Sequence, residues 1–229
     1  MEPNPQGYEA AMADAVLLDV DGTLVDTVYL HVAAWQQAFL EHDVVVPGVS
    51  VHAAIGMGGD RLVGWVAGDE VEERLGDPLR ERWEELFDTM LDRIRPTNGA
   101  AALVRTLKGR GLRVGLPSSG KDKHLAAARK QLDVDDCIDA IATTDDVDSS
   151  KPDDDLLQLT ADKIGSRDPV LVGDAPWDAA AAQKAGIPVI LVRTGGFSDA
   201  ALREQATPDV VIVDDPAELL RRLDETPLV

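Results

Sequence analysis

Six short apolar runs, rich in Val, Ile and Leu, recur along the chain between longer amphipathic stretches. The runs occupy residues 15–20, 112–117, 140–144, 169–174, 187–192 and 209–213. Because each run is apolar at consecutive positions, it is typical of a strand that is buried on both faces of a parallel sheet. Helical patterning fills the intervals at 98–110, 121–132, 153–164, 175–185 and 215–224. This βαβα order predicts an α/β fold with a doubly wound, mainly parallel sheet and a Rossmann-like core.

One interval, residues 27–96, breaks this rhythm because it contains helical patterning only. Trp35 and Trp83 lie in it at helical spacing from other aromatic residues, a pattern more typical of packing than of ligand binding. The interval ends at the proline and glycine of the run RPTNG, residues that interrupt regular structure. We therefore expect a helical cap domain at 27–96, inserted into a catalytic core made of 1–26 and 97–229.

The charge balance excludes several classes of partner. The chain carries 42 acidic and 22 basic residues, with a formal net charge of −20, and the acidic residues are spread along its length. Such a surface is unsuited to nucleic acid or to an anionic membrane. Only seven of the basic residues are lysine. An acidic, lysine-poor surface predicts a halophilic protein, and an ordinary acidic enzyme is the alternative.

The sequence also indicates where the protein works. Cys137 is the single cysteine, which excludes a disulfide framework and a four-cysteine zinc site. No run of about 18 apolar residues could span a bilayer, and the first apolar run is too short for a signal peptide. We expect a cytoplasmic protein without membrane or nucleic-acid partners. Whether it is a monomer or a weak dimer is left open.

Polar and charged side chains close or follow four of the predicted strands, at the edge where ligands bind in open α/β sheets. In chain order they are Asp19 and Asp21, Ser118 and Ser119, Lys151, and Asp174 and Asp178. Converging carboxylates raise one another's pKa unless a hard cation with oxygen ligands lies between them. The pattern therefore predicts a Mg²⁺ site at this edge of the sheet.

A Mg²⁺ ion beside one lysine and several hydroxyl groups suits a phosphoryl group, whose transfer depends on positioning and on neutralised charge. One aspartate can then accept the phosphoryl group and form an aspartyl phosphate. A second acid is needed to protonate the leaving group and later to activate water. Two neighbouring carboxylates at one strand end satisfy both requirements.

Four segments resemble, in order and spacing, the motifs of the haloacid dehalogenase superfamily. They are DVDGTLVDT, PSSG, SKPDDD and GDAPWDAAAAQKAG. The likeness extends from Ala13 to about Val213. It is strongest to the phosphatase and phosphomutase branch, which has a helical cap after the first strand. The resemblance implies that Asp19 is the nucleophile and Asp21 the general acid and base. It also implies that Asp19, the backbone carbonyl of Asp21, and Asp174 hold Mg²⁺.

The same resemblance assigns supporting roles. Asp178 is expected to bind the metal through water or to orient the site, although it could instead be an acid at a helix start. Ser118, Ser119 and Lys151 are expected to bind the phosphoryl oxygens, and Ser118 and Lys151 are counted as catalytic. The alternative for Ser118 is a helix N-cap. Gly22 is expected to permit the tight turn after the first strand.

The predicted cap offers His31, Gly58 and Arg61 as substrate-binding candidates, with the run GMGGDRL expected to be a loop facing the active site. His31 stands where sugar-phosphate mutases resembling this chain have a histidine. Gly59 stands where those mutases have a phosphate-binding arginine, and Arg61 is the nearest substitute. We therefore expect a Mg²⁺-dependent phosphatase that hydrolyses a small phosphorylated metabolite through an aspartyl phosphate. The alternatives are a mutase of the β-phosphoglucomutase type and, less favoured, a phospho-accepting receiver module.

Overall fold

The computed structural model describes residues 13–146 and 151–228 and contains the predicted parallel sheet. Its strands are β1 (Ala15–Leu18), β2 (Arg113–Ser118), β3 (Ala140–Thr143), β4 (Pro169–Gly173), β5 (Val189–Val192) and β6 (Val211–Val213). The spatial order is β3-β2-β1-β4-β5-β6, and all neighbouring pairs are parallel. All six predicted strands are confirmed, with ends displaced by one or two residues.

The centre of the sheet is the point where the strand order reverses, between β1 and β4. Leu18 of β1 is in register with Val172 of β4. Asp19 and Asp174, just beyond these strands, therefore come side by side. A crevice outside the carboxyl ends of the strands at such a reversal is the usual ligand site of a doubly wound sheet.

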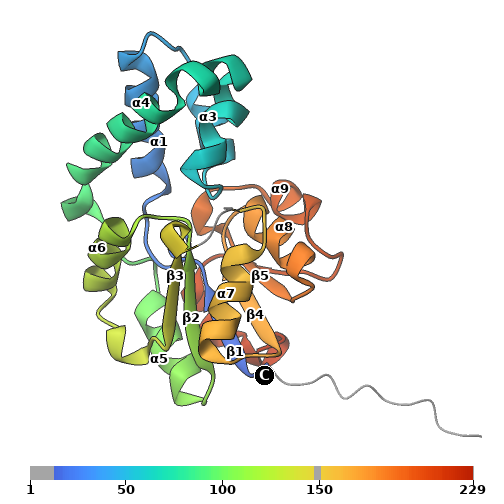
Figure 1. Cartoon of the computed structure of the whole chain (residues 1–229). Coiled ribbons are helices and arrows are strands. Elements are labelled where there is room, and N and C mark those ends of the chain that lie inside the picture. Colours follow the sequence, from blue (N-terminus) through green and yellow to red (C-terminus); the bar gives the residue numbers. More distant parts are fainter. Residues whose placement is uncertain (1–12, 147–150, 229) are drawn as a thin grey trace, which may run out of the picture.

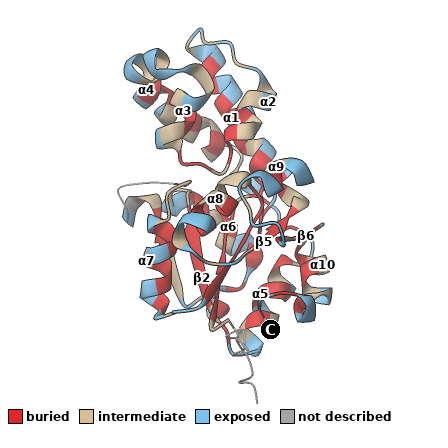
Figure 2. Cartoon of the chain, turned by 90° about the vertical axis from the view of Figure 1, so that its right-hand side faces the viewer, coloured by how far each residue is buried: buried red, intermediate tan, exposed pale blue. Residues whose placement is uncertain are grey.

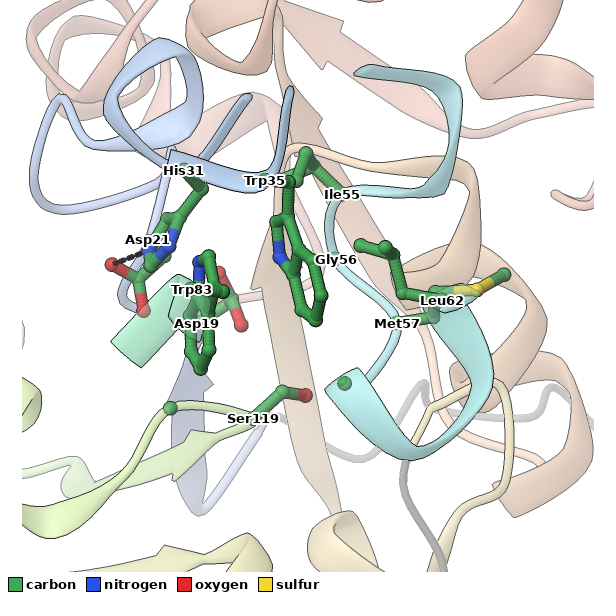
Figure 3. Close-up of a pocket in the computed structure, with 12 residues that line it drawn as sticks. Asp19, Asp21, His31, Trp35, Ile55, Gly56, Met57, Leu62, Trp83 and Ser119 are labelled. Atoms are coloured by element: carbon green, nitrogen blue, oxygen red, sulfur yellow. Dashed lines mark hydrogen bonds and ion pairs between the residues drawn. The ribbon is translucent and has the colours of Figure 1, made fainter. Parts of the chain in front are cut away.

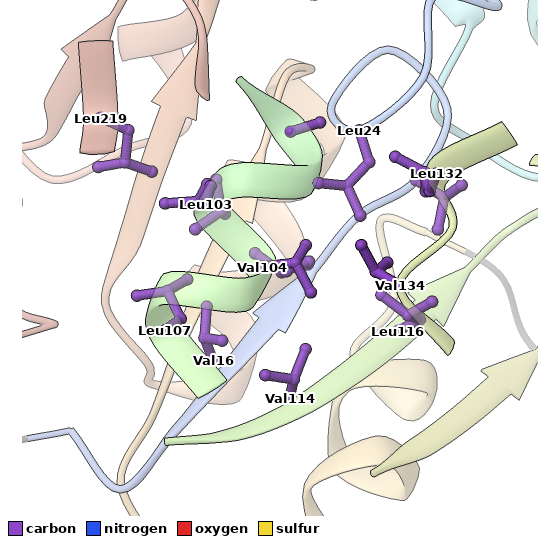
Figure 4. Close-up of a cluster of buried hydrophobic side chains, with 14 of the residues drawn as sticks. Val16, Leu24, Leu103, Val104, Leu107, Val114, Leu116, Leu132, Val134 and Leu219 are labelled. Atoms are coloured by element: carbon purple, nitrogen blue, oxygen red, sulfur yellow. The ribbon is translucent and has the colours of Figure 1, made fainter. Parts of the chain in front are cut away.

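Helices cover both faces of the sheet. Successive side chains of a strand point to opposite faces, so strands that are apolar at consecutive positions need a helical layer on each face. The core helices are α5 (Ala100–Gly109), α6 (Asp122–Leu132), α7 (Asp155–Ile164), α8 (Pro176–Ala185), α9 (Asp199–Glu204) and α10 (Pro216–Arg221). Val16 packs with Leu103 and Leu107 of α5 on one face (Figure 4). Leu17 packs with Leu157 of α7 on the other. The predicted helices are confirmed, and α9 is an additional short one.

A helical insert lies between β1 and α5 and sits over one end of the sheet (Figure 1). We use this name for residues 27–96, the predicted cap. Its helices are α1 (Val28–Glu41), α2 (Gly48–Ala54), α3 (Gly59–Ala67) and α4 (Asp69–Asp88). The 3₁₀ helices of the chain are η1 (Leu91–Arg93), η2 (Asp135–Cys137), η3 (Thr144–Asp146), η4 (Arg193–Gly195) and η5 (Leu223–Glu225).

The helical insert has an apolar cluster of its own, which includes Phe39, Leu79 and Phe87 and is separate from the clusters of the sheet. Figure 2 shows buried residues concentrated in the sheet and again within the insert. The two chain segments that join insert to core run side by side, because Asp26 N donates to Arg95 O at 2.8 Å. The domain boundaries at 26/27 and 96/97 stay our interpretation of this arrangement.

The run GMGGDRL differs from the expected loop, because α3 begins at Gly59. Gly58 precedes it as an extended residue, and the apolar side chains of Leu62 and Val63 are buried on the helix. Only the first part of the run is a loop. There, Gly56 has φ +101°, and a Cβ at this position would lie 2.8 Å from Ala175 Cβ of the core. Glycine is therefore required where insert and core approach one another.

No helix within residues 13–146 and 151–228 combines the length and the apolar character that crossing a bilayer requires.

Candidate active site

The turn after β1 places Asp19 at the carboxyl edge of the sheet. Asp19 N donates to Val172 O at 2.9 Å, which continues the pairing of β1 with β4 by one residue. The chain then turns at Gly22, whose φ is +90°. A Cβ on Gly22 would lie 2.3 Å from Asp174 Oδ2. Gly22 thus supplies both a left-handed backbone and the space that Asp174 needs.

Three buried carboxylates gather beyond β1 and β4. Asp19, Asp174 and Asp178 each offer an oxygen, and these oxygens lie within 4.8 Å of one another. Thr23 Oγ1 donates to Asp174 Oδ1 at 2.8 Å, which fixes one side of the cluster. Asp178 Oδ2 accepts the backbone N–H groups of Asp174 and Ala175 at 3.1 and 3.0 Å. These hydrogen bonds hold the cluster at the start of α8.

Lys151 supplies a buried cation beside the cluster. Its Nζ forms an ion pair with Asp19 Oδ1 and lies 2.7 Å from Asp178 Oδ1. Although burial lowers the pKa of Lys151, the charges of Asp178 and Asp19 outweigh that effect and hold the pKa above its ordinary value. Lys151 is therefore a permanent positive charge that orients Asp19.

One lysine does not neutralise three carboxylates. Burial raises the pKa of Asp19 to about 7, against the opposing charge of Lys151 and with the help of Asp178 and Asp21. Burial and the charges of Asp19 and Asp178 also raise the pKa of Asp174 well above its ordinary value. A hard divalent cation prefers such oxygen ligands and would allow both carboxyls to ionise. The donor set therefore fits Mg²⁺.

Asp21 turns its side chain away from this cluster and toward the helical insert. Thr27 Oγ1 donates to Asp21 Oδ1 at 2.6 Å, and His31 Nε2 lies 3.3 Å from the same oxygen. Burial alone would raise the pKa of Asp21. The hydrogen bonds and charge of His31, together with Thr27, outweigh burial and lower it. The resemblance assigns the backbone carbonyl of Asp21 to the metal, not its side chain. The side-chain contacts do not test that assignment, so it stays a prediction.

Two serines lie at the carboxyl end of β2, since Ser118 is its last residue and Ser119 follows it. Ser118 is buried, and its Oγ accepts the N–H of Gly120 at 3.1 Å. It does not cap α6, whose N-cap residue is Lys121. Ser119 Oγ is buried, and the described part of the chain offers it no hydrogen-bond partner. Buried polar groups are normally satisfied, so a free hydroxyl here is available to a ligand. Phosphate binding by Ser118, Ser119 and Lys151 stays a prediction.

A cavity lies between the core and the helical insert (Figure 3). The core contributes Asp19, Asp21, Ser119 and Gly120 to its wall. The insert contributes Gly56, Gly59, His31 and five apolar side chains: Trp35, Ile55, Met57, Leu62 and Trp83. A molecule in this cavity would have the acids of the core on one side and an apolar wall on the other.

The three insert residues proposed from the sequence lie in different places. His31 lines the cavity and contacts Asp21. Gly58 precedes α3 and is not among the lining residues. Arg61 does not line the cavity either, because its guanidinium forms an ion pair with Asp153 of the core. Arg61 therefore joins insert to core in this structure.

Sequence reasoning missed several residues of the site. Trp35 and Trp83 were interpreted as packing residues, and they line the cavity as well as packing. Beyond β5, Thr194 Oγ1 donates to Gly22 O at 2.5 Å, and a Cβ on Gly195 would lie 2.0 Å from Asp174 Oδ2. Thr194 and Gly195 lie directly after a predicted strand. The rule that ligands bind at the carboxyl ends of the strands identified the acids and could have identified these two residues as well.

Comparison with known proteins agrees with this geometry. The family model of haloacid dehalogenase-like hydrolases matches residues 13–186. A Bacillus subtilis protein named "Putative phosphatase YhcW" is 29% identical over 196 residues, which cover 79% of this chain and 84% of that protein. Phosphoglycolate phosphatase of Rhodospirillum rubrum is 27% identical over 197 residues, with coverages of 80% and 81%.

Solved structures show the same fold. A hydrolase from Pseudomonas syringae has a TM-score of 0.86 and 30% identity, covering 92% of this chain and 98% of that one. The β-phosphoglucomutase of Clostridium difficile has a TM-score of 0.79 at 19% identity, with coverages of 93% and 96%, and shares the fold. The match over most of the chain, on a parallel sheet whose central strand ends in buried acids, shows that this protein belongs to the haloacid dehalogenase-like hydrolases.

Proposed function

We propose that this enzyme is a Mg²⁺-dependent phosphatase that hydrolyses a small phosphorylated metabolite through an aspartyl phosphate on Asp19. The observation that carries the proposal is the position of Asp19. It lies beside a buried lysine and within 4.8 Å of two further acids, and it also lines the cavity under the helical insert. The family membership and the phosphatase names among its relatives support the reaction class.

Asp19 and Asp174, together with the backbone carbonyl of Asp21, are the groups that would hold Mg²⁺. Asp178, whose carboxylate converges with theirs, would bind the ion through water or orient the site. Bound there, the ion would supply positive charge to the phosphoryl oxygens and to the carboxylates around them. Lys151 adds a fixed positive charge on the same side. Ser118 and Ser119 provide hydroxyl groups that can hydrogen-bond to the phosphoryl oxygens.

In the first step, an oxygen of Asp19 attacks phosphorus and the bond between phosphorus and the ester oxygen breaks. The leaving oxygen takes a proton supplied by Asp21 together with its partner His31. The Asp21 carboxyl and the His31 imidazole lie 3.3 Å apart, so we assign this proton to the pair rather than to either group alone. In the second step, water attacks phosphorus and gives a proton to Asp21. The bond between phosphorus and the Asp19 oxygen breaks, which releases inorganic phosphate and restores the Asp19 carboxylate.

A sugar-phosphate mutase is the second candidate, because the fold is shared with a mutase. A mutase has to hold a bisphosphorylated intermediate, which needs a cationic anchor for the distal phosphate. Gly59 lines the cavity without a side chain, and Arg61 is engaged by Asp153. These observations favour hydrolysis. A receiver module is disfavoured, because it has no need of an insert over its acids.

The test is a screen of phosphorylated metabolites for phosphate release with Mg²⁺, at low and at molar KCl. The proposal predicts turnover of at least one monoester. A parallel incubation with β-glucose 1-phosphate and a bisphosphate primer examines the mutase. Glucose 6-phosphate appearing faster than inorganic phosphate would overturn hydrolysis as the main activity. Stoichiometric phosphorylation without turnover on any ester would indicate a receiver.

A further inference from the structure

We propose that the cavity selects monophosphate esters whose leaving group is uncharged and apolar, and that it rejects those carrying a second anionic group. This inference rests on the proposed phosphatase function and names its substrate class. The phosphoryl end of the substrate would lie at Asp19, so the leaving group would extend toward the wall that the helical insert contributes (Figure 3).

The insert wall is apolar and firmly packed. Trp35 and Trp83 stack on each other with ring centroids 5.0 Å apart and an interplanar angle of 9°. Among the described residues that line this wall, His31 is the one titratable side chain. Its ring stacks on Phe87 with centroids 3.9 Å apart, and its Nε2 faces Asp21. Its hydrogen-bonding atom toward the core is therefore already engaged. An apolar leaving group would replace water on this wall with favourable contacts.

No lysine or arginine is found among the residues that line the cavity in the described part of the chain. The cations nearest to it in the insert have other partners. Arg61 pairs with Asp153, while Arg80 pairs with Glu72 and donates to Gly59 O at 3.2 Å. The undescribed stretches 1–12 and 147–150 contain no lysine or arginine in their sequence. Among the described residues, the cavity wall therefore offers no lysine or arginine to an anion on the leaving group.

A carboxylate or second phosphate on the leaving group would lose its hydration without gaining a lysine or arginine partner, and His31 already pairs with Asp21. It would also face Asp21, an acid at the same cavity. Burying an unpaired anion is costly, and a like charge nearby adds to the cost. The cavity thus discriminates by charge as well as by apolar contact.

A matched substrate pair tests the charge directly. Benzyl phosphate and 4-carboxybenzyl phosphate have the same ester geometry and differ by one carboxylate at the far end of the leaving group. With the full-length enzyme and Mg²⁺, kcat/KM should favour benzyl phosphate by about tenfold or more. Glucose 6-phosphate serves as a third substrate, because its leaving group is uncharged but hydrophilic, and it should also be hydrolysed less efficiently than benzyl phosphate.

Gly59→Arg supplies the cation that the wall lacks. A Cβ at Gly59 would lie 3.6 Å from Trp35 Cζ2 and 3.8 Å from Arg80 Cγ, which are ordinary contacts, so the backbone tolerates a side chain. The preference for benzyl phosphate should fall to about threefold or less. Gly64→Arg is the matched control, because Gly64 lies on the same helix, outside the cavity, with its nearest neighbour at 3.6 Å. It should leave the preference unchanged.

The outcomes separate this inference from the proposed function. If no ester of any kind releases phosphate, the phosphatase proposal fails and the inference fails with it. If the wild-type enzyme has the same kcat/KM for 4-carboxybenzyl phosphate and benzyl phosphate, the inference is wrong. A higher kcat/KM for glucose 6-phosphate would also refute it, and in both cases the phosphatase proposal stands. The wild-type comparison decides the matter even if Gly59→Arg does not fold.

Discussion

Replacing Lys151 with methionine removes the one side-chain cation that pairs with the acidic cluster in the described part of the chain. The lysine side chain is 1% exposed and forms ion pairs with the buried carboxylates of Asp19 and Asp178. Methionine has a similar length and no charge, so packing changes little while the carboxylates lose their partner. We expect the variant to be less stable and, because Asp19 is no longer oriented, to lose phosphatase activity.

The expected loss of stability follows from the burial of Lys151 and its partners. Removing one partner of a buried ion pair costs about 3–5 kcal/mol of unfolding free energy, because the remaining charge is left uncompensated. For a chain of this size, that loss corresponds to a fall in melting temperature of about 6–20 °C. The matched control is Lys108→Met. Lys108 pairs with Asp139 at 2.6 Å, but the two side chains are 34% and 31% exposed, so its loss should cost less than about 1 kcal/mol.

Urea unfolding followed by circular dichroism, with the metal chelated by EDTA, measures both variants against the wild-type protein. Mg²⁺ should restore part of the stability of Lys151→Met, since a bound cation would compensate the same carboxylates. If Lys151→Met lost no more stability than Lys108→Met, the account of an acidic cluster that depends on a buried cation would be refuted.

Three further predictions concern metal, salt and pH. Phosphate release should require Mg²⁺ and fail with Ca²⁺, which takes more ligands at longer distances, and equal rates with Ca²⁺ or EDTA would count against the metal site. The melting temperature should rise with KCl well beyond about 0.15 M, and a flat profile would remove the halophilic interpretation. Burial and the charge of His31 lower the pKa of His124 below its ordinary value of 6.5, although the hydrogen bond and charge of Asp88 oppose this shift. The unfolded chain then binds the proton more readily, so stability should fall as the pH drops below about 6.5. His124→Gln should flatten this loss, measured by urea unfolding at several pH values, and parallel wild-type and variant curves would contradict it.

The sheet could be predicted because its signal is local. Each strand is a short run of consecutive apolar residues, and parallel strands present their carboxyl ends at one edge. Asp19 and Asp174 could therefore be placed together from sequence positions far apart. The helix α9 (Asp199–Glu204) was missed because six residues are too few for a helical period to stand out.

The cavity wall could not be predicted, because it depends on how the helical insert sits on the core. A helical stripe shows that Trp35 and Trp83 are buried, but it does not show that part of their surface faces Asp19. The same long-range arrangement decides the partner of Arg61. Asp153 is 92 positions away in the sequence, and nothing local distinguishes it from the many other acids.

The central claim is that Asp19 carries the phosphoryl group, and mass spectrometry of acid-quenched enzyme tests it most directly. Wild-type enzyme mixed with a hydrolysable ester and Mg²⁺ should yield a peptide containing Asp19 whose mass is increased by one phosphoryl group. Asp19→Asn should show no such peptide and should release no phosphate, while its circular dichroism spectrum stays unchanged, because an amide cannot attack phosphorus. A phosphoryl group found on another residue, or a folded Asp19→Asn enzyme that retains substantial turnover, would contradict the account.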